Sequence, residues 1–114
     1  MKKILFLFLW LGGTTLFGQA VLPLKERAKA IEQIQQGRFE VLLPQLMQAH
    51  DIDAWVIITR EYNEDPVVKT MLPPTWLNAR RRTILVFTKD TKTGEVSRAS
   101  ITRYPFGKLI PSVW

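Results

Sequence analysis

Acidic and aromatic side chains gathered in one turn are the first candidates for chemistry in this sequence. The turn follows the apolar run 54–58, which has the composition of a buried strand. In open α/β sheets, ligands bind beyond the carboxyl ends of the strands, so this turn is the best local candidate for contact with a substrate or partner. The residues expected to make this contact are Glu61, Tyr62 and Asn63. The neighbouring Glu64 and Asp65 are more typical of a solvated loop, in which Asp65 caps the helix that follows.

A metal centre or a nucleophilic triad has little support among these residues. The chain has one histidine, His50, and no cysteine, so a zinc site would need carboxylates for most of its ligands. Asp51 and Asp53 lie close by, but they fit better as the end of a helix and the turn into a strand. No serine or acid near His50 has the pattern of a hydrolytic triad. We therefore assign no catalytic, cofactor-binding or metal-binding residue in this chain.

Consecutive arginines form a second candidate contact surface. Arg80, Arg81 and Arg82 belong to a chain with a formal net charge of +6 and a pI near 10.0. A basic cluster is what nucleic-acid binding requires, but no binding motif accompanies it and no aromatic residues are interleaved with the arginines. Residues 21–65 contain five basic and eight acidic side chains, whereas residues 66–114 contain nine basic and two acidic ones. The arginines are therefore expected to pair with the acidic front half, or with a second domain or subunit.

The first twenty residues have the three parts of a secretory signal peptide. A basic start at Lys2 and Lys3 precedes the apolar run 4–11, and small residues follow as far as Ala20. The apolar run is shorter than the roughly 20 residues of a membrane span, so we expect cleavage rather than a permanent membrane anchor. We expect an exported protein, periplasmic if the source is a Gram-negative bacterium. Export also argues against a nucleic-acid partner.

Residues 21–114 have the pattern of one α/β domain, with a small mixed sheet and flanking helices. Apolar residues at spacings of three and four predict helices over 24–34 and 39–50. We expect Gly37 to interrupt this helical region, and Pro44 to cause a kink or a restart. The second helix should end near Ala49 or His50.

The remaining elements are predicted to be strands, a short helix and irregular segments. The run 54–58 predicts a central strand that is covered on both faces, as in a mostly parallel sheet. Asp65 and Pro66 predict a helix start. A second buried strand over 83–88 is expected to form a hairpin with a half-exposed outer strand over 95–102. Trp76 lies in an irregular stretch, where it belongs either to the core or to an interface.

Two longer stretches resemble a known family. Residues 38–66, RFEVLLPQLMQAHDIDAWVIITREYNEDP, resemble the start of the creatinase and prolidase type of amino-terminal domain. Such domains open with an arginine, a helix with leucines and a methionine, a turn with an aspartate, and a hydrophobic strand. The matching residues are Arg38, Leu43, Leu46, Met47, Asp53 and 54–58. Residues 61–87, EYNEDPVVKTMLPPTWLNARRRTILVF, look closer still to exported Xaa-Pro aminopeptidase-like members of the M24 metallopeptidase family.

The resemblance covers about residues 24–110 and implies a two-domain protein, of which only an incomplete first domain is present. In that family the amino-terminal domain helps to form dimers and shapes access to the active site. The pita-bread catalytic domain, absent from this sequence, holds a dinuclear centre of manganese, cobalt or zinc, whose hydroxide attacks the peptide bond before proline. None of its ligands can be carried over to this chain.

The implied function is therefore that of a non-catalytic domain in an exported hydrolase. Its partners would be its own catalytic domain and, in the full-length protein, a second copy. The alternative is a stand-alone periplasmic binding or assembly module without enzymatic activity, which would use the turn 61–65 and the arginine cluster as contact surfaces.

Overall fold

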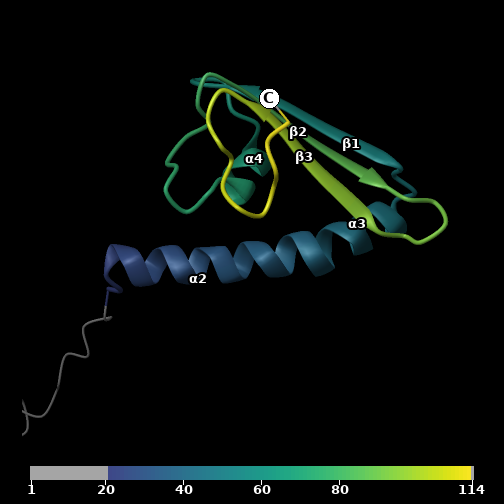
Figure 1. The fold of residues 1–114 in the computed structure, drawn as a ribbon, viewed down its shortest axis with the longest axis horizontal. Coiled ribbons are helices and arrows are strands. Elements are labelled where there is room, and N and C mark those ends of the chain that lie inside the picture. The colour runs from purple at the N-terminus through teal and green to yellow at the C-terminus, as the bar shows by residue number, and fades with distance from the viewer. Residues whose placement is uncertain (1–20, 114) are drawn as a thin grey trace, which may run out of the picture.

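The computed structural model describes residues 21–113. The expected signal peptide, residues 1–20, and Trp114 lie outside the described residues. The elements are α2 (Leu24–Gly37), η1 (Arg38–Leu42), α3 (Leu43–Ala49), β1 (Ala54–Arg60), α4 (Pro66–Met71), β2 (Arg82–Lys89) and β3 (Val96–Thr102). Figure 1 shows α2 and α3 running below a three-stranded sheet. Over the range 21–113, none of the helices is both long enough and apolar enough to cross a bilayer.

The first helical region is continuous across Gly37, so the predicted interruption there is wrong. Gly37 has ordinary right-handed helical angles, with φ −60° and ψ −37°. The helix widens instead into one π-helical stretch, η1, where the Leu43 N–H donates to the Arg38 carbonyl five residues earlier. This wider turn lies immediately before Pro44, whose ring would clash with the preceding turn of a regular α-helix. The predicted restart near Pro44 is confirmed, since α3 begins at Leu43, and its predicted end is confirmed at Ala49.

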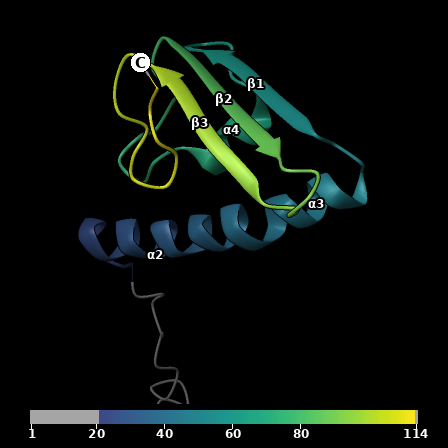
Figure 2. The same ribbon diagram turned by 45° about the vertical axis from the view of Figure 1, so that its right-hand side comes forward.

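The sheet has the order β1-β2-β3, and both pairs of strands are antiparallel. The turned view in Figure 2 shows the three strands side by side with α4 behind them. The hairpin of β2 and β3 is confirmed. The only parallel pairing within residues 21–113 is an isolated bridge between Ser100 and Ser112. The α/β architecture is thus correct, but the mostly parallel sheet expected around β1 is wrong.

The inner face of the sheet carries the core. Ile57 of β1 and Leu85 and Phe87 of β2 are buried there, at 4%, 0% and 0% exposure. They belong to one cluster with residues from η1, α3, α4 and the C-terminal segment, namely Phe39, Leu43, Met47, Val68, Met71, Phe106 and Ile110. Every helix that contributes to this cluster therefore packs on the same face of the sheet.

β1 is an edge strand covered on one face, not the predicted central strand covered on both. Its burial alternates along the strand, and Val56 and Ile58 are 51% and 67% exposed. The prediction failed because an uninterrupted apolar run was taken as evidence for two covered faces. The same run fits an antiparallel strand whose outward side chains are also apolar.

The helix that follows β1 begins as predicted. The Asp65 carboxylate accepts the Val67 N–H at 2.7 Å, and Pro66 occupies the first helical position. Within residues 21–113, two ion pairs join the acidic front half to the basic back half, as the charge distribution predicts, but both use lysines and neither uses the arginines at 80–82. Their members are Glu64 with Lys69 at 3.7 Å and Asp53 with Lys89 at 3.3 Å.

Candidate functional site

The register of the sheet aligns one tripeptide across all three strands. Residues 58–60 of β1 read Ile-Thr-Arg, residues 82–84 of β2 read Arg-Thr-Ile, and residues 101–103 at the end of β3 read Ile-Thr-Arg again. Because the strands are antiparallel, the reversed copy on β2 places like residues beside one another. We call the sets that the register pairs the isoleucine row (Ile58, Ile84, Ile101) and the threonine row (Thr59, Thr83, Thr102). The arginine row is Arg60, its partner Arg82, and Arg103, which directly follows the end of β3.

The threonine row points inward, where each hydroxyl fixes a loop. All three threonines are buried, at 4% exposure or less. Thr59 donates to the Asn63 carbonyl at 3.2 Å and accepts the Asp65 N–H at 3.2 Å. Thr83 donates to the Arg80 carbonyl at 3.3 Å, and Thr102 donates to the Tyr104 carbonyl. These bonds satisfy the buried hydroxyls and hold the loops at this end of the sheet.

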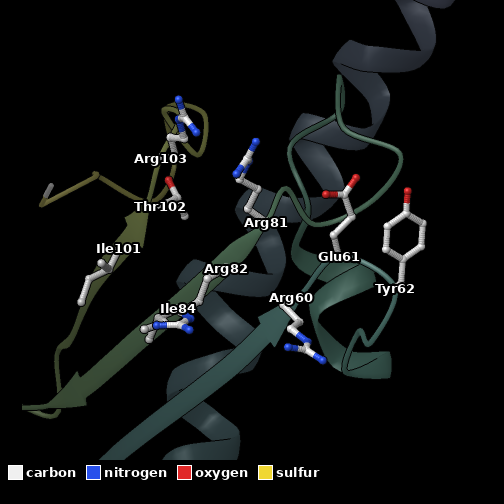
Figure 3. A pocket seen from close by; sticks show the side chains of 9 residues that line it. All are labelled: Arg60, Glu61, Tyr62, Arg81, Arg82, Ile84, Ile101, Thr102 and Arg103. Carbon is white, nitrogen blue, oxygen red and sulfur yellow. The ribbon is translucent and has the colours of Figure 1, made fainter.

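The isoleucine row and the arginine row lie on the opposite, outer face, because side chains alternate along a strand. A cleft of about 980 Å³ opens over the arginine row and over Ile84 and Ile101 of the isoleucine row. Figure 3 shows Arg81, Arg103 and Glu61 extending past the ends of the strands, while Arg82 lies back towards Ile84. The lining residues are Arg60, Glu61, Tyr62, Arg81, Arg82, Ile84, Ile101, Thr102 and Arg103.

The cleft combines positive charge with an apolar floor. Four arginines line it and only one carboxylate, that of Glu61, so its formal charge is strongly positive. The ion pairs within residues 21–113 lie elsewhere, at Lys69 and Lys89. Guanidinium groups bind carboxylates and phosphates through paired hydrogen bonds. The arrangement can therefore hold an anionic group whose neighbouring part is apolar.

Two residues beside the cleft have left-handed backbone conformations. Tyr62 has φ 67° and Arg81 has φ 52°, and neither is glycine. The Glu61 N–H donates to the Arg81 carbonyl at 2.8 Å, which joins the two turns. A left-handed residue other than glycine costs about 1 kcal/mol or more, and such residues gather at binding sites. Tyr62 is also 97% exposed, so its ring is available to a ligand or partner.

A second, more polar cleft adjoins the first. Its volume is about 420 Å³, and it shares Glu61 and Tyr62 with the arginine-lined cleft. Its other lining residues are Asn63, Glu64, Lys69 and Asn78. The Glu64 carboxylate accepts the Ala79 N–H at 2.6 Å and pairs with Lys69, so its role here is to tie two loops together.

The structure separates Trp76 and Arg80 from the other candidate contact residues. The Arg80 guanidinium lies over the rings of Trp76 and Tyr104, 5.2 and 5.6 Å from their centroids. Trp76 is partly buried and packs edge-on against Phe106, with ring centroids 5.4 Å apart. Glu61, Tyr62, Arg81 and Arg82, in contrast, meet at the arginine-lined cleft, and Asn63 lies in the polar cleft.

The residues considered for a metal centre lie at a helix end, in a turn and in an ion pair. His50 caps the end of α3, Asp51 has φ 53° in the turn that follows, and Asp53 pairs with Lys89. In the part of the chain that the structure describes, no three histidine, aspartate or glutamate side chains gather as metal ligands.

The sequence alone did not point to Arg60, Arg103 or the isoleucine row. The signal that could have found them is the tripeptide Ile-Thr-Arg, present at 58–60 and 101–103 and reversed at 82–84. It becomes informative only once the three strands are known to pair antiparallel in this register. Comparisons of the chain with protein-family models, curated proteins and solved structures find no match.

Proposed function

We propose that the chain is the non-catalytic amino-terminal domain of an exported Xaa-Pro aminopeptidase-like metallopeptidase, and that it works through contact with other domains. The observation that carries this proposal is the apolar outer face of the sheet, which ends in the arginine row. An exposed apolar patch rimmed by charge is typical of a surface that is covered in an assembly. The resemblance of residues 38–66 and 61–87 to creatinase-type domains supplies the family.

In this proposal the chemistry belongs to a pita-bread catalytic domain outside this chain. That domain would hold the dinuclear manganese, cobalt or zinc centre, and the full-length protein would be a periplasmic homodimer. The amino-terminal domain would contribute to the dimer and shape the approach to the active site. The arginine-lined cleft and the turn at Glu61 and Tyr62 would then face a neighbouring domain or the incoming substrate.

The test is the size and activity of the native protein. An antibody raised against residues 21–114 isolates it from the source cell, and its intact mass is measured by mass spectrometry. We expect a species far heavier than 13.2 kDa. The isolated protein should cleave a fluorogenic Xaa-Pro peptide when manganese is added and lose this activity with a chelator.

A recombinant chain of residues 21–114 is the matched control, and it should not cleave the peptide under the same conditions. Cleavage by this chain would show that the catalytic ligands lie within it. A native species slightly below 13.2 kDa would exclude catalysis by an attached domain.

The second candidate is a stand-alone periplasmic binding or assembly module. The observation that favours it is the arginine-lined cleft, which brings Glu61 and Tyr62 together with Arg81 and Arg82 on one surface. The small native species in the experiment above, without peptidase activity, is the result expected for this candidate.

A further inference from the structure

The outer face of the sheet is an apolar surface with charge at one end only. Next to the isoleucine row lies a second apolar row, Val56, Val86 and Ala99, in the same register. Beyond it the face ends in Ala54, Thr88 and Ser97, which carry no charge. The arginine row closes the opposite end. The two ends of the surface therefore differ in charge, so an occupant has one preferred orientation along the strands.

The geometry of this face selects a helix as its occupant. A sheet face offers side chains but no backbone hydrogen bonds, so whatever covers it must satisfy its own backbone groups, as a helix does. Three strands about 4.8 Å apart form a strip roughly 10 Å wide, close to the diameter of an α-helix. β1 has seven residues and spans about 23 Å, which a helix of about 15 residues matches.

The arginine row determines which end of the helix lies over it. Three guanidinium groups, with Arg81 beside them, face only Glu61 in the cleft. Carboxylates on the occupant would supply the missing negative charge. The C-terminal end of a helix also carries partial negative charge, so that end is favoured over the arginines.

Two other occupants fit the charges less well. A second copy of this face, stacked in the opposite direction, would place its uncharged end over the arginine row. In the same direction it would oppose arginines to arginines. Residues 1–20 contain Lys2 and Lys3 but no acidic residue, so they too lack the complementary charge.

We infer that the outer face docks an amphipathic helix of a partner protein, with its apolar stripe on the isoleucine row and its carboxylates on the arginine row. This inference rests on the second candidate function, that of a binding or assembly module, and specifies the partner. It also accounts for the outer apolar side chains, which contribute little to the core on the inner face.

The test uses two synthetic helical peptides of about 15 residues. Both carry leucines at i, i+3, i+4 and i+7, and they end either in three glutamates or in three lysines. Binding to the purified protein is measured by fluorescence anisotropy. We expect the glutamate peptide to bind about tenfold more tightly at low salt, since several exposed ion pairs together reach that size. Raising the salt concentration should reduce the difference.

Charge reversal at the face is the matched comparison. The double variant Arg60→Glu and Arg82→Glu should bind the lysine peptide more tightly than the glutamate peptide. The control variant Lys92→Glu and Lys108→Glu changes the net charge equally, at exposed positions outside the cleft, and should keep the original preference. Equal affinity for both peptides, or the same loss in the control, would overturn the inference.

A variant of the apolar part keeps the test independent of charge. Ile58→Asp replaces a side chain that is 67% exposed, so the fold should persist by circular dichroism while peptide binding is lost. If neither peptide binds the unchanged protein, the inference is wrong. It is also wrong if the protein sediments as a dimer that Ile58→Asp dissociates and arginine reversal leaves intact, because a second copy then covers the face. The native mass is measured separately, so failure here does not decide the proposed function.

Discussion

The two faces of the sheet are built from the same strands and are almost equally apolar, yet only one of them is covered by residues 21–113. Ile57, Leu85 and Phe87 on the inner face are buried under the helices. Val56 and Ile58, one position away on the outer face, are more than half exposed. Side-chain composition therefore does not reveal which face forms the core. The position of the helices decides it.

At the end of the sheet that carries the Ile-Thr-Arg residues, the two faces differ in burial and in charge. On the inner side the threonine row is buried, and its hydroxyls hold three loops in place. On the outer side the arginine row faces solvent over an apolar floor. Alternating Ile-Thr-Arg residues thus send neutral, internally satisfied groups to one side and cations to the other. The inner side stabilises the domain, and the outer side is suited to binding.

Truncating one side chain on each face should give the largest contrast. Leu85→Ala removes a side chain that is fully buried in the core, and we expect it to lower the free energy of unfolding by about 2 to 5 kcal/mol. Ile84→Ala, on the adjacent outer-face position, should cost about 1 kcal/mol or less. Urea denaturation followed by tryptophan fluorescence measures both. Equal losses would show that the outer face is covered within this chain.

Two arginines on opposite faces of the sheet give a smaller contrast. Arg98 pairs with Phe87 in the register and faces inward, with its guanidinium 5.8 Å from the Phe39 ring centroid. Its Nη1 is buried, and no hydrogen-bond partner for it is found in residues 21–113. A buried unpaired donor costs about 1 to 3 kcal/mol, part of which the contact with Phe39 offsets. Arg98→Met should therefore raise the free energy of unfolding by about 1 kcal/mol.

The control for this prediction is Arg103→Met on the outer face. Arg103 is exposed, so the change should leave the free energy of unfolding within about 0.5 kcal/mol of the original value. Both variants are measured by thermal denaturation at one ionic strength. Destabilisation by Arg98→Met would mean that the ring contact outweighs the unpaired donor.

Removing one inner hydroxyl tests the threonine row. Thr83→Val keeps the shape of the side chain but removes the hydrogen bond to the Arg80 carbonyl. The expected loss is about 0.5 to 1.5 kcal/mol in the free energy of unfolding. Thr88→Val is the matched change at an exposed outer-face position and should have almost no effect. A similar loss in both variants would point to strand propensity rather than to the buried bond.

Much of the local structure follows from the sequence. Pro44 predicts the restart of the helix, and Asp65 with Pro66 predicts the start of α4, because both signals depend on neighbouring residues alone. The hairpin of β2 and β3 is predicted for the same reason. Strand order and the uncovered face of β1 are not, because they depend on which distant segments pair. Gly37 was a misleading signal, since glycine tolerates a helix as well as interrupting it.

The candidate site is only partly predictable. The turn at Glu61 and the arginines at 81 and 82 are visible as a polar cluster after a strand and as a charge run. Arg60 joins them only through the antiparallel register, which pairs it with Arg82, and Arg103 joins them because it follows Thr102, the last residue of β3. Arg80 belongs to the same run but turns away to Trp76, because successive residues of an irregular segment face different directions.

The turn between β2 and β3 gives the smallest expected effect. Its response to acid shows whether low pH changes this end of the sheet without changing either face. The Asp90 carboxylate accepts the N–H groups of Lys92, at 2.7 Å, and of Thr93, at 3.1 Å. These bonds favour the charged form and hold the pKa of Asp90 below its ordinary value of 3.8.

The pKa of Asp90 is lower in the folded chain than in the unfolded one. Its contribution to the stability of the folded state is therefore complete above pH 3.8 and is lost as the pH falls through the pKa of the folded chain. The amide signals of Lys92 and Thr93 in nuclear magnetic resonance spectra should therefore shift below pH 3.8, before the amide of the buried Leu85 does. Asp90→Asn cannot titrate and should abolish the early shift. A midpoint at or above 3.8 would show that the two N–H groups do not stabilise the carboxylate, whereas an equally early shift at Leu85 would mean that acid disturbs the covered face together with the turn.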